Sequence, residues 1–132
     1  MQRIADVALV VPDYDEAIDF YVNRLGFTLV SDIDLGGRKR WVRVRPEDDD
    51  SGTCLLLAQA VDELQKAAIG NQTGGRVGFF LQTDDFASDY TRLKDNGVQF
   101  LEAPRHEDYG SVAVFSDPWG NKWDLIEPRP EA

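Results

Sequence analysis

An internal repeat is the feature that most limits how this chain of 132 residues folds. The apolar run "VALVV" (7–11) precedes one helical pattern, and the run "VGFFLQT" (77–83) precedes a second. Asp13 and Asp85 stand at the starts of these helical patterns, 72 residues apart. Three strand-like runs follow each helical pattern, so the order β-α-β-β-β is predicted twice.

We expect one domain built from a first module at about 3–60, a linker at 61–75 and a second module at about 76–128. Asp13 with Glu16 forms a capping-box-like start, and Gly26 supplies the stop. The second helical pattern covers 84–97. The remaining expected elements are strands at 27–31, 40–45, 53–58, 98–102, 111–115 and 122–126, turns or loops at 34–39 and 46–52, and a short helical turn around Leu64, Ala67 and Ala68.

The charge balance excludes some classes of partner. The chain has 24 acidic and 14 basic residues, a net charge of −10, so neither nucleic acid nor an anionic membrane surface is an expected partner. Cys54 is the only cysteine and adjoins three leucines, which indicates a buried structural thiol. The N-terminus has no basic region followed by a long apolar run, and no run could span a bilayer. These features predict a cytoplasmic protein.

Each module has one helix for four strands, and one helix covers only one face of a sheet. The other face needs the second module, a partner chain or a ligand, which predicts a groove between two curved sheets. Strand alternation assigns side chains to the groove. The groove-facing residues are predicted to be Asp6, Ala8, Val10, Trp41, Arg43, Arg45, Leu56, Gly78, Phe80, Gln82, Ser111, Ala113, Phe115, Asp124 and Ile126.

Six of these residues form the predicted ligand-binding set: Asp6, Trp41, Arg43, Phe80, Phe115 and Asp124. Aromatic faces would stack on a ligand, and arginines would bind an anionic group. The alternatives stay open: the aromatic residues pack in a core or a dimer interface, and the arginines face water or pair with the two aspartates.

Several stretches resemble a known family: "VVPDYDEAIDFYVNRLGF" in the first half, "TDDF" and "NGVQF" in the second, and "YGSVAVFSDPWGNKWDLIEP" near the end. The pattern is similar to the vicinal oxygen chelate superfamily, which includes glyoxalases, bleomycin resistance proteins and extradiol dioxygenases. The resemblance covers nearly all of 3–128. It implies an α+β fold in which two tandem βαβββ modules form an open, barrel-like mixed sheet around a cleft, with the helices outside and the chain in a homodimer.

Enzymes of that superfamily hold a divalent metal with four side chains, typically His or Glu, from the first and last strands of each module. The matching positions here are Asp6, Leu56, Gly78 and Asp124, and two of them have no ligating side chain. The only histidine, His106, lies in a polar loop and is expected at the surface. We therefore expect no metal and no other cofactor, and interpret Asp124 as a polar anchor where the family has a ligand.

Three functions follow as hypotheses. The first is a glyoxalase/bleomycin resistance-like protein that binds a small aromatic molecule in the inter-module cleft without a His/Glu metal site. The alternative is a metal-dependent lyase, isomerase or dioxygenase with a reorganised site at Asp6 and Asp124, joined by Glu107 or His106. The third is an interaction protein whose groove is a dimer seam.

Overall fold

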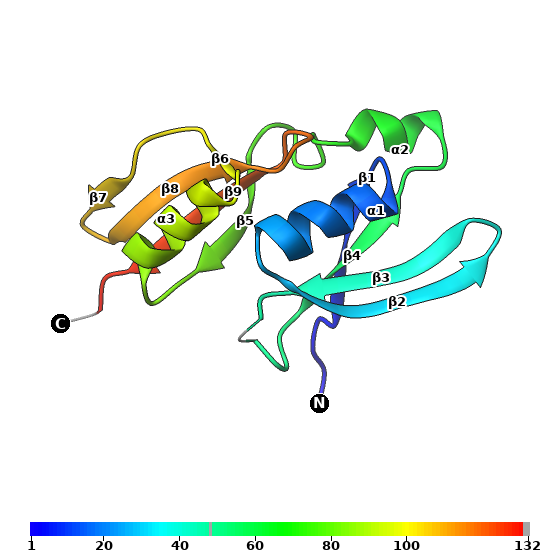
Figure 1. The fold of residues 1–132 in the computed structure, drawn as a ribbon, viewed down its shortest axis with the longest axis horizontal. Helices are drawn as coiled ribbons and strands as arrows, with labels where there is room; N and C mark the ends of the chain where they lie inside the picture. The colour runs from blue at the N-terminus through cyan, green and yellow to red at the C-terminus, as the bar shows by residue number, and fades with distance from the viewer. Residues whose placement is uncertain (48, 131–132) are drawn as a thin grey trace. The chain divides into compact units, whose positions relative to one another are not determined.

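The structure is a computed structural model that describes residues 1–47 and 49–130. It contains two compact units, Met1–Ile69 and a second unit that begins at Gly70. Each unit consists of a mixed β-sheet with a helix across one face (Figure 1).

The first unit has a four-stranded sheet in the order β1-β4-β3-β2. Strands β1 and β4 are parallel, and the other neighbours are antiparallel. The elements are β1 (Asp6–Val11), α1 (Tyr14–Ile18), the π-helix η1 (Asp19–Arg24), β2 (Thr28–Gly36), β3 (Lys39–Arg45), β4 (Cys54–Gln59) and α2 (Glu63–Ala68).

The predicted first helix is confirmed, with the predicted cap. Oδ2 of Asp13 accepts a hydrogen bond from the N–H of Glu16 at 2.9 Å, which satisfies a donor at the start of α1. The helix widens into η1, where the N–H of Leu25 donates to the carbonyl of Phe20 at 2.9 Å. Because a π-helix turns by less per residue, Phe20 and Tyr21 are both buried.

The β2–β3 hairpin is longer than predicted. A turn was expected at 34–39, but β2 continues to Gly36 and only Gly37 and Arg38 connect the strands. Both residues have positive φ angles, 60° and 67°, as in the tight turns that suit twisted hairpins. Glycine signals in the sequence mark the turn but overstate its length.

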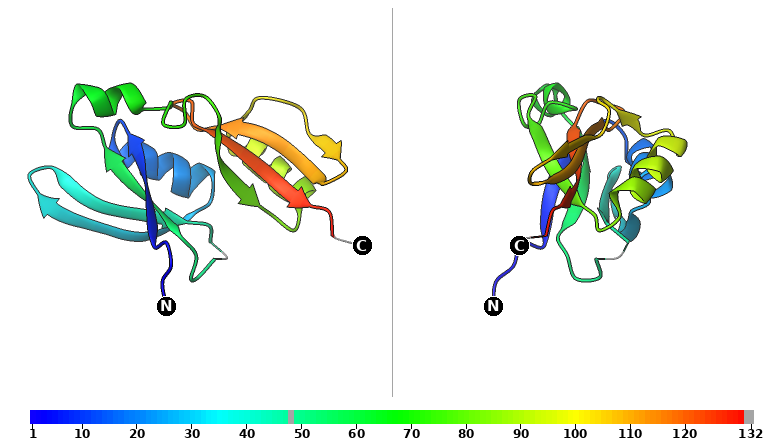
Figure 2. Two further views of the ribbon diagram at one scale, coloured as in Figure 1. Left: turned by 180° about the vertical axis from the view of Figure 1, so that it is seen from behind. Right: turned by 90° about the vertical axis from the view of Figure 1, so that its left-hand side faces the viewer.

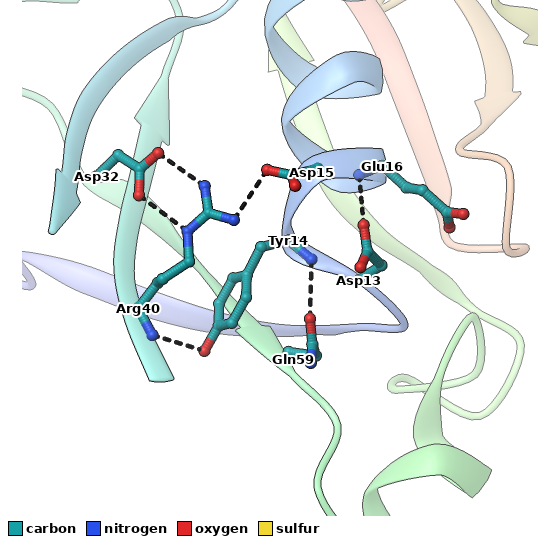
Figure 3. A network of polar contacts seen from close by, with 7 residues as sticks. All are labelled: Asp13, Tyr14, Asp15, Glu16, Asp32, Arg40 and Gln59. Carbon is teal, nitrogen blue, oxygen red and sulfur yellow. Dashed lines mark hydrogen bonds and ion pairs between the residues drawn. The ribbon is translucent and has the colours of Figure 1, made fainter. Parts of the chain in front are cut away.

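A polar network ties this hairpin to the start of α1 (Figure 3). The guanidinium of Arg40 donates to Asp32 at 2.8 and 3.1 Å and to Asp15 at 2.8 Å. The hydrogen bond from Arg40 lowers the pKa of Asp32. The backbone N–H of Arg40 donates to Oη of Tyr14, whose own N–H donates to Gln59. The network joins β2, β3 and β4 to one end of the helix.

The second unit has a sheet in the order β5-β9-β8-β6, with β7 paired to β8. Strands β5 and β9 are parallel, and the other pairs are antiparallel. The elements are β5 (Val77–Gln82), α3 (Phe86–Asp95), β6 (Gln99–Phe100), β7 (Arg105–Glu107), β8 (Gly110–Ser116) and β9 (Lys122–Pro128).

This unit departs from the predicted order by one short strand. The run expected at 98–102 forms only the two residues of β6. The polar loop that contains His106 pairs with β8 as β7, which was not predicted. Its residues Arg105, His106 and Glu107 have no apolar alternation, so the sequence offered no strand signal.

Aromatic rings form the core beneath α3, and they correct one predicted orientation. Phe115 is 0% exposed, with its ring centroid 5.7 Å from Trp123 and 5.6 Å from Phe100. The register pairs Phe115 with Trp123 and Val114 with Asp124. The predictions that Ser111, Ala113 and Phe115 face the groove are therefore wrong, because these residues lie on the helix side and Val112 and Val114 lie on the other. The larger apolar surface of the ring faces the core, and the valines take the other face.

The turn at 117–121 is built around a buried carboxylate. Oδ1 of Asp117 accepts hydrogen bonds from the N–H groups of Trp119, Gly120 and Asn121 at 2.9–3.1 Å. Oδ2 accepts another from Nδ2 of Asn121 at 2.6 Å. The carbonyl of Trp119 packs so closely on Gly70 that a Cβ at Gly70 would overlap it. The turn thus fixes both the start of β9 and the start of the unit.

The predicted α+β class with two βαβββ-type modules is confirmed, and neither sheet closes into a barrel. The predicted short helical turn of the linker forms α2, which buries none of its side chains. Among residues 1–47 and 49–130, no helix has the length and apolar character needed to cross a bilayer.

Candidate functional site

The candidate site residues lie on the sheet face opposite the helix in each unit, which we call the open face. In the first unit, Asp6, Trp41, Arg43 and Leu56 share this face: Arg43 is paired in register with Leu56, and Leu56 with Ala8. Leu9, Val42 and Leu57 lie on the opposite face and are fully buried. The predicted face assignment is confirmed for this unit. Figure 2 (left) shows the sheet from the side away from α1.

Asp6 and Arg43 form an ion pair on the open face of the first unit. Nε of Arg43 donates to Oδ1 of Asp6 at 2.6 Å, and both side chains are half-buried. The hydrogen bond to Asp6 raises the pKa of Arg43, so the arginine stays charged. The sequence had left this pairing open as an alternative to ligand binding. Cys54, which pairs in register with Asp6, is fully buried as expected.

In the second unit, Phe80 and Asp124 lie side by side on the open face. They are direct partners in the parallel register of β5 and β9. The Phe80 side chain is 66% exposed, which leaves a large apolar ring facing solvent next to a carboxylate. This face assignment is confirmed as well.

The carboxylate of Asp124 is not fully hydrogen-bonded by the described residues. Its Oδ1 is buried and forms no hydrogen bond within the described part of the chain. Burial raises the pKa of Asp124, Arg105 acts to lower it, and Glu102 acts to raise it. A buried oxygen without a donor costs free energy that a ligand could recover by supplying one.

Arg105 and Glu102 are residues that the sequence did not assign to the site. Nε of Arg105 donates to both carboxylate oxygens of Glu102 at 3.0 Å, and Nη1 donates to Glu107 at 3.1 Å. Glu102 also accepts from the N–H of Val114. Arg105 thus binds two carboxylates, and no hydrogen bond or ion pair joins it to Asp124. The only sequence signal was the i, i+3 spacing of Glu102 and Arg105 in a region expected to be a strand and a loop.

The residues present do not fit the four-ligand metal site that the resemblance implied. Leu56 pairs with Ala8 in the first unit as Asp124 pairs with Phe80 in the second, and Ala8 and Phe80 are 72 residues apart. Leu56 therefore stands at the position of Asp124, and it offers no donor. Gly78 offers none either, and Asp6 is bound by Arg43.

The alternative ligands do not complete the set. His106 pairs with Ser111 across β7 and β8, and its Nδ1 lies 2.9 Å from Oγ of Ser111 on the face opposite Asp124. Glu107 is bound by Arg105. In the part of the chain that the structure describes, no three His, Cys, Asp or Glu side chains gather as a metal would need.

The chain is similar to several known proteins. An uncharacterized protein of Shewanella frigidimarina (strain NCIMB 400) is 53% identical over 127 residues, which cover 96% of this chain and 93% of that protein. The crystal structure of UcmS2 is 29% identical with a TM-score of 0.82, covering 96% of this chain and 98% of that one. The crystal structure of TnmS3, an antibiotic binding protein from Streptomyces sp. CB03234, is 32% identical with a TM-score of 0.76, and 98% of each chain is covered.

The family model agrees with these similarities and with the resemblance noted from the sequence. The model of the Glyoxalase/Bleomycin resistance protein/Dioxygenase superfamily matches residues 3–125. Because the match spans both units, the chain belongs to the Glyoxalase/Bleomycin resistance protein/Dioxygenase superfamily.

Proposed function

We propose that this protein binds a small aromatic organic molecule on the open faces of its sheets and needs no metal to do so. The observation that carries the proposal is the pair Phe80 and Asp124. An aromatic ring that is 66% exposed adjoins a carboxylate whose buried Oδ1 has no donor among the described residues. A flat ligand with a hydroxyl or amine would cover the ring and donate to the carboxylate.

One of the comparisons supports a binding role. TnmS3, at 32% identity, is described as an antibiotic binding protein, and a sequence this similar makes a comparable class of ligand a reasonable expectation. The donor set supports the absence of a metal, since Leu56 and Gly78 stand where two ligands would be needed. Stacking on aromatic rings provides affinity without any reacting group.

The test is calorimetric titration of chelator-treated protein with 2-naphthol, 2-naphthamide and aromatic antibiotics of three or four rings. Phe80→Ala should weaken binding about fivefold or more, because loss of an aromatic contact costs about 1 kcal/mol beyond the lost area. Leu64→Ala is the matched control: Leu64 is an exposed apolar residue of α2, outside both open faces. The proposal fails if no compound binds, or if Phe80→Ala binds as tightly as the control.

A second candidate is a metal-dependent lyase, isomerase or dioxygenase with a reorganised site. The unpartnered Oδ1 of Asp124 favours it, because such an oxygen also suits a hydrated divalent cation. Chelated protein would then gain thermal stability on addition of Ni²⁺, Zn²⁺, Mn²⁺ or Fe²⁺, and Asp124→Ala would lose that gain. A melting temperature unchanged by all four ions would contradict this candidate.

A further inference from the structure

We propose that the open face of the first unit holds a subsite for the acidic group of an aromatic ligand, in which Trp41 contacts the ring and Arg43 and Arg45 bind the acid. The inference rests on the proposed function, because it names the chemical class of ligand that this function would serve. It also adds Arg45 to the candidate site.

The three side chains alternate along β3 and therefore share one face. Along β3 these side chains change from apolar to charged, and their cross-strand partners on β2 change from apolar to polar in the same direction. Ile33 lies opposite Trp41, Ser31 opposite Arg43, and Thr28 opposite Arg45. The two strands thus change from apolar to cationic over a few residues, which matches a molecule with an aromatic body and a charged end.

Arg45 is the unusual member of this row. It is half-buried, and its side chain has no hydrogen bond or ion pair with any other described residue. Arg40 and Arg105, in contrast, are each bound by two carboxylates. A guanidinium removed partly from water is costly without an anion, and none of the carboxylates in residues 1–47 and 49–130 pairs with Arg45.

Arg43 also has hydrogen-bond donors that are free to bind a ligand. Only its Nε contacts Asp6, so its terminal nitrogens have no hydrogen bond to the described residues. Two guanidinium groups face one carboxylate here, a local charge of +1 on a chain whose net charge is −10. The other ion pair of these strands, Asp32 with Arg40, lies on the helix side, because Asp32 is opposite Val42.

An acid fits this arrangement better than a base does. Guanidinium groups bind carboxylates through paired, charge-assisted hydrogen bonds, whereas a cationic ligand would be repelled by the excess positive charge. Trp41 is 37% exposed and offers a ring for stacking beside the arginines. The subsite is therefore assigned to aromatic carboxylates and related aromatic acids.

The test compares 2-naphthoate with 2-naphthamide, which share a ring system and differ in charge, by calorimetry on the full chain. Wild type should bind the acid at least about tenfold more tightly than the amide, because hydrogen bonds between guanidinium and carboxylate groups are charge-assisted. Arg45→Gln should remove this preference and leave 2-naphthamide binding unchanged. Arg76→Gln makes the same charge change in the second unit and should keep the preference.

The outcomes separate the inference from the function beneath it. Equal binding of the two compounds to wild type would overturn the acid subsite and leave the proposed function standing, whereas no binding of either would overturn both. If Arg45→Gln weakens both compounds alike, Arg45 acts on the fold and the inference is wrong. The inference is also wrong if Arg45→Gln lowers the molar mass measured by light scattering and leaves the preference for the acid intact. In that case the open face of the first unit joins two copies of the chain.

Discussion

Replacing Asp117 with alanine should destabilise the second unit strongly. The carboxylate is 2% exposed and accepts four hydrogen bonds, three from backbone N–H groups of its own turn. Each hydrogen bond to a charged group contributes about 1.5–3 kcal/mol. Three of the four share one oxygen and water would enter the truncated site, so the contributions do not add. We expect a loss of about 3–5 kcal/mol in the free energy of unfolding.

Asp117→Asn provides a graded comparison. The amide keeps an acceptor for the three N–H groups and loses the contact between Oδ2 and Asn121, so about 1–2 kcal/mol is expected. Asp84→Ala is the control: it removes an exposed aspartate just before α3 and should change the free energy of unfolding by less than about 0.5 kcal/mol.

Urea unfolding followed by tryptophan fluorescence measures these differences, because Trp119 lies in the turn and Trp123 lies just after it. The slope of the transition should stay constant, so that the midpoint reports stability. A loss below about 1 kcal/mol for Asp117→Ala at constant slope would refute the reasoning, as would equal effects of the alanine and asparagine variants.

Two further predictions concern the second unit. Burial raises the pKa of Asp124, so the folded state holds the proton of this carboxyl group more tightly than the unfolded state does. The free energy of unfolding therefore falls as the pH rises from the unfolded-state pKa of about 3.9 to the higher folded-state pKa. Asp124→Asn should therefore be more stable than wild type at pH 7 by urea unfolding, with a gain that shrinks toward pH 4; a gain independent of pH would contradict this. Phe115→Ala should cost about 3–5 kcal/mol, as for a buried ring, and a cost below about 1 kcal/mol would place the ring on the open face after all.

The repeat and the caps made most of the fold predictable. Asp13 and Asp85 cap α1 and α3 as expected, since an aspartate before an apolar periodic segment satisfies donors that any helix start leaves free. The faces of β3 were predictable because Val42 and Val44 alternate there with aromatic and charged residues.

The faces of strand β8 could not be predicted from alternation, because both of them are apolar. Val112, Ala113, Val114 and Phe115 give no polar residue that marks the outside, so alternation leaves two registers open. The structure chooses the register that places Phe115 among the rings of Phe100 and Trp123. Contacts between distant parts of the sequence therefore decided this part of the candidate site.

The sequence predicted which residues lie at the candidate site better than it predicted how their charges are paired. Asp6, Trp41, Arg43, Phe80 and Asp124 lie on open faces as expected, and their roles in binding stay predictions. The commitment of Arg105 to Glu102 and Glu107 depends on β7, which has no strand pattern. For that reason the uncompensated state of Asp124 could not be inferred from its own position in the sequence.

The central claim is that this chain binds an aromatic molecule on its open faces without a metal. A nitrogen-15 NMR titration of chelator-treated protein with 2-naphthamide tests it most directly. We predict shift changes that concentrate on Phe80, Asp124 and Trp41 and that do not change when Zn²⁺ or Fe²⁺ is added. Shift changes that require the metal, or that spare all three residues, would contradict the claim.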